Sequence, residues 1–322
     1  MTHPARSDSA PTGAGHDADS ARPRFADRLS SALTRTGTPV CVGLDPVYEK
    51  LPIAVAGGHP DACSAIEAFC IGILDAVAGL VPIVKMQSAC FERYGSAGVA
   101  VLERVCEHAR RDGLLTILDA KRGDIGISAA HYAAAAAEMG VDAVTVSPYL
   151  GLEPLTPFLE EGLGIFVLVR TSNPESESIQ SPGLATGGTV AEMVAERVAA
   201  FGRGCLGGAG LSAGGLSEVG AVVGATKASD ASSLRERMPD QVFLVPGIGA
   251  QGGSVEEALG LARRDGTGEP IRDPARAGLL LTASRSILYP ARAGEMGSDW
   301  ARASRDAACE LIGQVRGMLD AG

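Results

Sequence analysis

The sequence Leu-Thr-Ile-Leu-Asp-Ala-Lys-Arg-Gly-Asp-Ile, residues 115–125, decides the fold and the chemistry expected of this chain. An apolar run that contains β-branched residues is typical of a buried strand, and this one ends abruptly in charged residues. Side chains alternate between the faces of a strand, so Asp119 and Lys121 are expected on the same face. Gly123 then lets the backbone turn, which brings Asp124 to the mouth of a site. Because charges beside a buried strand are costly, the Asp-x-Lys-x-x-Asp pattern predicts a functional site, and a salt-bridged strand end is the alternative.

The composition favours a parallel α/β protein. The 322 residues are 46% hydrophobic but only 4% aromatic, so the core must consist of Ala, Val, Leu and Ile, as buried parallel sheets prefer. Lys and Arg number 28 against 38 Asp and Glu, which gives a net charge of −10. This charge argues against nucleic acid or an anionic membrane as a partner. An anionic small substrate is compatible with it, because a few local Lys and Arg residues can override the global field.

Cysteine usage and the chain's N-terminal segment bear on its location. The seven cysteines include no Cys-x-x-Cys pair, which predicts reduced, buried thiols of a cytoplasmic protein and no structural zinc. Residues 1–22 are rich in Ser, Ala, Pro, Gly and Asp and are expected to form a disordered tail rather than a signal peptide, before a catalytic domain at 23–322. The most apolar later segment, 62–84, is interrupted by Glu67, Asp75 and Pro82, so no membrane span is expected.

Short apolar runs alternate with helical patterns along the chain. The candidate strands are 39–45, 81–86, 115–121, 143–148, 165–171, 220–226, 242–249 and 279–285. The candidate helices are 99–112, 128–139, 153–161, 190–201 and 300–319, and Gly directly follows the first three, as is usual after a last helical turn. Eight strands alternating with helices predict a single-domain parallel (β/α)8 TIM barrel. An open doubly wound sheet is the alternative, although the first strand lacks its Gly-x-Gly-x-x-Gly turn.

Two segments between the fifth and sixth strands stand out. Residues 174–188 are polar and rich in helix breakers, and residues 202–215 are unusually rich in glycine. Long loops without secondary structure in compact domains are usually lids or binding loops, so a lid or binding role is expected for this connection.

Polar residues fall at the predicted carboxyl ends of the strands, where barrel enzymes carry their chemistry. Lys85 lies in an apolar strand, so its ammonium group is expected to pair with the carboxylates of the third strand. Asp45 is interpreted as an acceptor for ribose hydroxyls, with a helix cap or turn as the alternative, and Ser172 could be an ordinary turn hydroxyl. The glycine-rich turn 247–253 and Arg285 after the last strand predict a phosphate site, because backbone N–H groups and a guanidinium fork both bind phosphate oxygens.

Several motifs together resemble orotidine 5′-phosphate decarboxylase, most closely its longer bacterial branch. They are Asp-Ala-Lys-Arg-Gly-Asp-Ile (119–125), Leu-Asp-Pro (44–46), Val-Lys-Met-Gln (84–87), Ser-Pro-Tyr-Leu-Gly (147–151), Arg-Thr-Ser-Asn-Pro (170–174) and Pro-Gly-Ile-Gly-Ala-Gln-Gly-Gly (246–253). The resemblance extends from about residue 24 to residue 289. Asp-x-Lys-x-x-Asp alone is shared with sister sugar-phosphate decarboxylases, whereas the combination is far more specific.

The resemblance implies a catalytic Lys-Asp-Lys-Asp array formed by Lys85, Asp119, Lys121 and Asp124. It also implies a homodimer, because the last aspartate of this array enters the neighbouring subunit's site in the family. No cofactor and no metal are implied. One departure is Ser284, where the short-form enzymes have glycine before the phosphate-binding arginine, so the backbone contact expected at that position is in question.

The resemblance further implies a set of substrate-binding residues. They are Asp45, Ile125, Ser128, Ser172, Gly249, Gln251 and Arg285. Asp45 would hold the ribose and Ser172 the pyrimidine, while Gln251 and Arg285 would hold the phosphate. Ile125 and Ser128 would accompany the aspartate that crosses the dimer interface.

The expected reaction is loss of CO₂ from C6 of orotidine 5′-phosphate, which leaves a carbanion and yields uridine 5′-phosphate. A Lys121 ammonium group would oppose the developing charge and deliver the proton. One alternative is a Mg²⁺-dependent sugar-phosphate lyase or epimerase with Asp45 and Asp119 as ligands. Others are a Schiff-base aldolase using Lys85 or Lys121, and a non-enzymatic phosphate-binding barrel.

Overall fold

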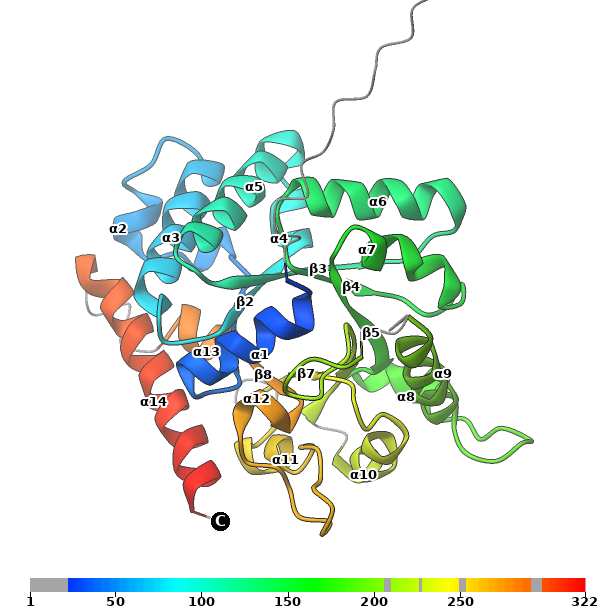
Figure 1. Cartoon of the computed structure of the whole chain (residues 1–322). Coiled ribbons are helices and arrows are strands. Elements are labelled where there is room, and N and C mark those ends of the chain that lie inside the picture. The colour runs from blue at the N-terminus through cyan, green and yellow to red at the C-terminus, as the bar shows by residue number, and fades with distance from the viewer. Residues whose placement is uncertain (1–22, 206–209, 226–227, 249–252, 291–296, 322) are drawn as a thin grey trace, which may run out of the picture.

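The computed structural model describes residues 23–205, 210–225, 228–248, 253–290 and 297–321. Within these ranges, eight parallel strands close a barrel in sequence order, with the last strand paired to the first (Figure 1). The strands are β1 (Val40–Leu44), β2 (Ile83–Gln87), β3 (Leu115–Arg122), β4 (Ala143–Val146), β5 (Gly164–Arg170), β6 (Val219–Val223), β7 (Phe243–Pro246) and β8 (Leu279–Ala283). The predicted TIM barrel is confirmed, and the open doubly wound sheet is excluded.

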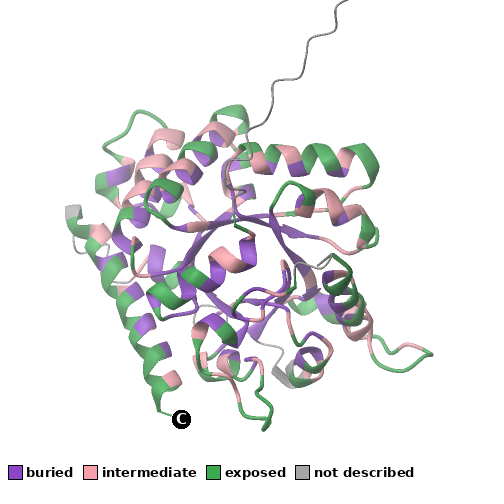
Figure 2. Cartoon of the chain, viewed as in Figure 1, coloured by how far each residue is buried: buried purple, intermediate pink, exposed green. Residues whose placement is uncertain are grey.

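Helices surround the barrel and cover the outer faces of its strands (Figure 1). The larger ones are α1 (Phe25–Thr36), α3 (Ala62–Val77), α5 (Gly95–Arg111), α6 (Gly126–Glu138), α9 (Val190–Cys205), α10 (Ala228–Arg237) and α14 (Trp300–Asp320). The shorter ones are α2 (Ile53–Ala56), α4 (Ser88–Glu92), α7 (Thr156–Glu160), α8 (Glu177–Gln180), α11 (Val255–Leu259), α12 (Pro274–Ala277) and α13 (Arg285–Leu288). Figure 2 shows buried residues along the strands and on the inner helix faces, with exposed residues outside, as amphipathic helices on a buried sheet require.

Helix α1 closes the amino end of the barrel, a role that the strand and helix patterns did not reveal. In Figure 1 it lies across the near end of the strands. Phe25, Leu29 and Leu33 belong to the buried cluster that fills the barrel interior. The Phe25 ring meets the ring of Phe166 of β5 edge to face, with centroids 6.0 Å apart. With this end sealed by apolar packing, the opposite end is the one left for a site.

The connection after β5 differs in part from expectation. The segment 174–188 contains a 3₁₀ turn at Pro174–Ser176 followed by α8, so its first half is ordered local structure rather than a structureless loop. Part of the glycine-rich segment 202–215 falls on residues 206–209, outside the described residues. The predicted tail at 1–22 lies outside them as well. In the described part of the chain, no helix combines the length and apolarity needed to cross a membrane.

Candidate active site

A cavity of about 420 Å³ lies at the carboxyl ends of the strands. Six of the sequence-predicted site residues line it, namely Asp45, Lys85, Asp119, Lys121, Ser172 and Arg285. They come from the ends of five different strands or the loops that follow them, because Asp119 and Lys121 both belong to β3. The apolar part of the lining includes Leu168, Val222 and Leu244, which also contact the barrel core. The fold therefore gathers charged groups from distant parts of the sequence on one wall of a partly apolar cavity, as ligand sites typically do.

The end of β3 is irregular, and this irregularity presents Lys121 to the cavity. The pairing with β4 runs from Leu118 opposite Val144 to Arg122 opposite Val146, so β3 carries extra residues there. Lys121 has a φ of 48°, the one non-glycine residue with positive φ in the described ranges. A side chain in this left-handed region costs about 1–2 kcal/mol, so the surrounding contacts must hold it there.

Asp119 is the centre of the charged cluster. Its Oδ2 accepts a hydrogen bond from Lys85 Nζ at 2.9 Å, and its Oδ1 accepts one from Lys121 Nζ at 2.6 Å. The Thr145 hydroxyl also donates to Oδ1, at 2.9 Å. The Asp119 and Lys85 side chains are 10% and 7% exposed, whereas Lys121 is 47% exposed. Lys121 is therefore the more exposed of the two ammonium groups of this cluster that line the cavity.

The charges of this cluster stabilise one another. Burial opposes ionisation of Asp119, but the Lys85 and Lys121 ammonium groups outweigh it and lower the pKa of Asp119 to about 2. Burial also opposes the charge on Lys85, yet Asp45 and Asp119 together raise the pKa of that lysine. Asp119 and Lys85 are therefore both ionised at neutral pH.

Asp45 lies beside this cluster with capacity to bind a ligand. Its Oδ1 is 3.5 Å from Lys85 Nζ, an ion pair without a hydrogen bond. That oxygen is buried and has no hydrogen-bond partner among the described residues. A buried carboxylate oxygen without donors favours a hydroxyl-bearing ligand, because an incoming O–H group would satisfy it.

Asp124, Ile125 and Ser128 do not line the cavity of their own chain. Asp124 Oδ1 accepts the backbone N–H of Ile125 at 2.8 Å, and the Ile125 side chain is 59% exposed. Within one chain, Lys121 therefore has Asp119 as its recorded carboxylate partner. This placement is compatible with the predicted use of these residues in a neighbouring subunit.

The predicted phosphate site is described only in part. Gly247 has a φ of 98°, which turns the chain directly after β7, and Gly247 and Ile248 line the cavity with Arg285. Gly249 and Gln251 lie outside the described residues. Ser284 has a negative φ of −120°, so the backbone there does not require the glycine of the short-form enzymes.

The loop that carries Ser172 is anchored by a buried arginine. Arg170, only 2% exposed, donates from Nε to Asp230 and from a terminal nitrogen to Glu177, both at 2.8 Å. These bonds join the end of β5 to α8 and α10. Ser172 is thereby attached to a fixed segment of the cavity wall rather than to a free loop.

Several polar residues of the cavity wall were not among the site residues predicted from the sequence, although most of them belong to the polar strand ends noted there. They are Gln87, Thr145, Thr171, Asn173, Gln180, Thr282 and Ser284. Gln180 accepts the Thr171 backbone N–H at 2.9 Å. A threonine in an apolar strand is not unusual, so Thr145 and Thr282 gave no sign of their position; only their place near predicted strand ends could have indicated it.

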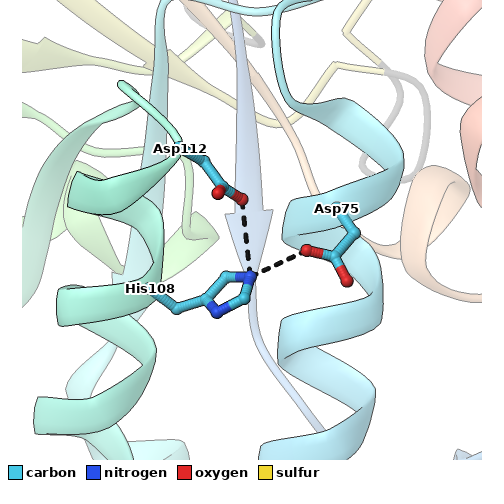
Figure 3. Close-up of side chains that lie close together, drawn as sticks. All are labelled: Asp75, His108 and Asp112. Carbon is cyan, nitrogen blue, oxygen red and sulfur yellow. Dashed lines mark hydrogen bonds and ion pairs between the residues drawn. The ribbon is translucent and has the colours of Figure 1, made fainter.

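One group of potential metal ligands exists in the described part of the chain, and it lies outside the cavity. Asp75 of α3 approaches His108, and Asp112 follows one turn later at the end of α5 (Figure 3). His108 Nε2 is 2.7 Å from Asp75 Oδ1 and 3.4 Å from Asp112 Oδ2. These contacts join the ends of two helices near the amino ends of the strands. None of the three residues lines the cavity, so they provide no cofactor site for its chemistry.

Comparisons with known proteins agree with this geometry. Residues 38–288 match the model of the orotidine 5′-phosphate decarboxylase / HUMPS family. An orotidine 5′-phosphate decarboxylase of Rhodopirellula baltica is 41% identical over 91% of this chain and 99% of its own length. That of Deinococcus radiodurans is 37% identical over 92% of this chain and 98% of its own length. The solved structure of Leishmania donovani OMP decarboxylase, 30% identical, superposes with a TM-score of 0.71 over 92% of this chain and 99% of that one.

The match therefore spans all eight strands of the barrel, and the motifs at 84–87 and 119–125 carry the residues of the charged cluster. This chain belongs to the orotidine 5′-phosphate decarboxylase / HUMPS family.

Proposed function

We propose that this protein decarboxylates orotidine 5′-phosphate to uridine 5′-phosphate, without a cofactor or metal. The observation that carries the proposal is the buried Asp119 carboxylate held between Lys85 and Lys121 at the cavity wall. The relatives that are 37–41% identical over most of the chain are decarboxylases of this substrate, which supports the same reaction here.

In the proposed complex, the substrate spans the cavity from the β8 end to the β3 end. Arg285 binds the phosphate through its guanidinium fork, together with Gly249 and Gln251. Asp45 accepts the ribose hydroxyls, and Ser172 bonds the pyrimidine. The binding energy of the phosphate, remote from the reacting carbon, contributes to orienting the base.

The proposed chemistry takes place beside Lys121. The bond between C6 and its carboxylate breaks, the electron pair stays on C6, and CO₂ leaves. The Lys121 ammonium group stabilises the carbanion and then transfers its proton to C6, after which water reprotonates the amine. Asp119 orients this lysine through the hydrogen bond that it accepts from Nζ, and the repulsion between Asp119 and the substrate carboxylate is relieved as CO₂ departs.

We further propose that the protein is a homodimer in which Asp124, Ile125 and Ser128 complete the neighbouring site. A group of large hydrophobic side chains is exposed after β3 and β4: Ile125 (59%), Ile127 (75%), Tyr132 (41%), Tyr149 (88%) and Leu150 (51%). Such a concentration next to Asp124 favours a protein interface. Sedimentation velocity tests it: the wild type is expected to be dimeric, and Ile127→Glu is expected to be monomeric and inactive.

We propose a cytoplasmic location, which the seven free cysteines support. The predicted burial of the thiols holds for Cys41, Cys70 and Cys106 but is wrong for Cys205 and Cys309, which are exposed.

The decisive assay follows the loss of orotidine 5′-phosphate absorbance in the presence of EDTA. Turnover that survives the chelator supports the proposal and argues against the Mg²⁺-dependent lyase. Borohydride added with substrate tests the Schiff-base alternative, since it would trap a lysine imine irreversibly. Absence of any turnover would leave a phosphate-binding barrel and refute the proposed function.

A further inference from the structure

Thr145 lies at the point where β3 departs from regular pairing. It is the β4 residue between Val144 and Val146, opposite the extra residues of β3, and it is 1% exposed. Its side chain also lines the cavity. It is therefore a buried polar residue in direct contact with both the irregular strand end and the space for a ligand.

The Thr145 hydroxyl makes two hydrogen bonds whose directions are fixed by chemistry. The backbone N–H of Lys121 can only donate, so the hydroxyl oxygen accepts it, at 3.0 Å. The ionised Asp119 carboxylate can only accept, so the hydroxyl proton points to Oδ1, at 2.9 Å. One side chain thus holds the backbone of the more exposed lysine and the carboxylate beside it.

These two bonds act on a strained element. Lys121 has a φ of 48°, and its N–H finds a side-chain acceptor where a regular strand would offer a carbonyl. Without this hydroxyl, the Lys121 amide would have no recorded acceptor, and the left-handed conformation would lose a contact that holds it. The position of Lys121 Nζ relative to the cavity depends on that backbone conformation.

We propose that Thr145 is a positioning residue that sets the relative geometry of Lys121 and Asp119 for the proton transfer and charge stabilisation described above. The inference rests on the proposed function. Thr145 acts through the two charged residues.

The chain contains a matched control on the same pair of strands. At the amino ends, the Thr116 hydroxyl accepts the backbone N–H of Asp142 and donates to its carboxylate, both at 3.2 Å. Thr116 is fully buried and does not line the cavity. Removing its hydroxyl therefore tests loss of the same kind of bonds without a change at the lysine.

The experiment compares Thr145→Val, Thr145→Ser and Thr116→Val by steady-state kinetics with orotidine 5′-phosphate and by thermal unfolding. Thr145→Val is expected to lower kcat between about 10-fold and 100-fold, as a small displacement of a catalytic group does, while KM changes less than about threefold. Thr145→Ser, which keeps the hydroxyl, is expected to stay within about threefold of the wild-type kcat. Thr116→Val is expected to unfold at a lower temperature with kcat unchanged.

Two results would overturn the proposal: a Thr145→Val enzyme with wild-type kcat, or a Thr145→Ser enzyme as slow as the valine variant. If the valine variant does not fold, Thr145→Ala replaces it and is judged against serine in the same way. Wild-type turnover is measured first, because its absence refutes the proposed function. If the wild type turns over and Thr145→Val has the same kcat, only the positioning role of Thr145 is refuted.

Discussion

The two ends of the β3–β4 pair carry nearly the same polar motif and lie in different surroundings. At the amino ends, the Asp142 carboxylate accepts the Thr116 N–H at 2.7 Å and pairs with Arg28 of α1. At the carboxyl ends, the Asp119 carboxylate accepts hydrogen bonds from the Thr145 hydroxyl and from the ammonium groups of Lys85 and Lys121. Each end therefore combines an aspartate, a threonine and cationic side chains.

The surroundings decide what each motif does. Asp142 is 3% exposed, and its cationic partner comes from the helix that covers the barrel end. Asp119 is also buried, but its partner Lys121 is 47% exposed and lines the cavity. Paired charges covered by a helix contribute to stability, whereas the same charges facing a cavity can act on a ligand. The chemical role of such a motif therefore follows from its access to a ligand and not from its residue types.

The largest expected effect is that of Lys121→Ala. In the proposed mechanism, loss of the ammonium group removes both the proton donor and the charge that opposes the carbanion, so kcat is expected to fall by about 10⁴-fold or more. Binding of uridine 5′-phosphate, measured by calorimetry, is expected to persist. The matched variant is Arg28→Ala, which leaves Asp142 without its arginine and is expected to lower stability by about 3–5 kcal/mol at unchanged kcat. Near-normal turnover by Lys121→Ala would contradict the assignment of this lysine.

The next effect compares the two aspartates directly. Asp119→Asn is expected to lower kcat by about 10²–10³-fold, because Lys121 loses the carboxylate that orients its ammonium group. Asp142→Asn removes the same negative charge at the closed end, so it is expected to destabilise the fold, in urea unfolding, without lowering kcat. If both variants lost activity equally at a temperature where both are folded, the functional distinction between the two ends would be wrong.

The barrel and its charged cluster could be predicted because both depend on patterns within short stretches of the sequence. Alternation of apolar runs with helical patterns gave the eight strands, and the strand period placed Asp119 and Lys121 on one face. The cost of burying an unpaired ammonium group predicted that Lys85 would find a carboxylate of β3, as it does.

What could not be predicted depends on contacts between distant parts of the chain. Helix α1 has an ordinary amphipathic sequence, and nothing local shows that Phe25 enters the barrel interior. Thr145 contacts Lys121 and Asp119 because the pairing of β3 with β4 is irregular there. The positive φ of Lys121 belongs to the same irregular segment, and no feature of the local sequence indicates it. Tertiary context of this kind overrides propensity.

Acid titration offers a smaller test, because one carboxylate at each end of the barrel changes the free energy of unfolding in opposite directions as the pH falls. The pKa of Asp119 lies at about 2, below the ordinary aspartate value of 3.8, so its charged form stabilises the fold at neutral pH. This contribution, about 2 kcal/mol, is lost as the pH falls from about 4 through about 2. At the amino end, burial raises the pKa of Glu218 despite the N–H of Ala26 and the charge of Arg24. The contribution of Glu218 to the free energy of unfolding therefore has the opposite pH dependence and becomes more favourable as the pH falls.

Urea unfolding of Asp119→Asn and Glu218→Gln, from pH 6 downward, separates these contributions. Asp119→Asn is expected to flatten the loss of stability in acid relative to the wild type, and Glu218→Gln to steepen it. Identical slopes for the three proteins would show that neither carboxylate contributes to the pH dependence.

The smallest effect concerns Gly43 and Gly164, two glycines at opposite ends of the barrel that neighbouring side chains approach too closely for a Cβ atom to fit. A Cβ on Gly43 would lie 2.0 Å from Ser284 Oγ beside the cavity, and one on Gly164 would lie 2.1 Å from Phe25 Cδ1 under α1. Gly43→Ala must displace Ser284, next to Arg285, so KM is expected to rise by about 3- to 10-fold, and the added change Ser284→Gly is expected to restore it because it removes the clash. Gly164→Ala must instead displace the ring that seals the barrel, so a loss of about 1–3 kcal/mol in urea unfolding is expected at unchanged KM. Should Gly43→Ala lower stability alone, Ser284 would have no part in binding and the division of labour between the two ends would not extend to β1 and β8.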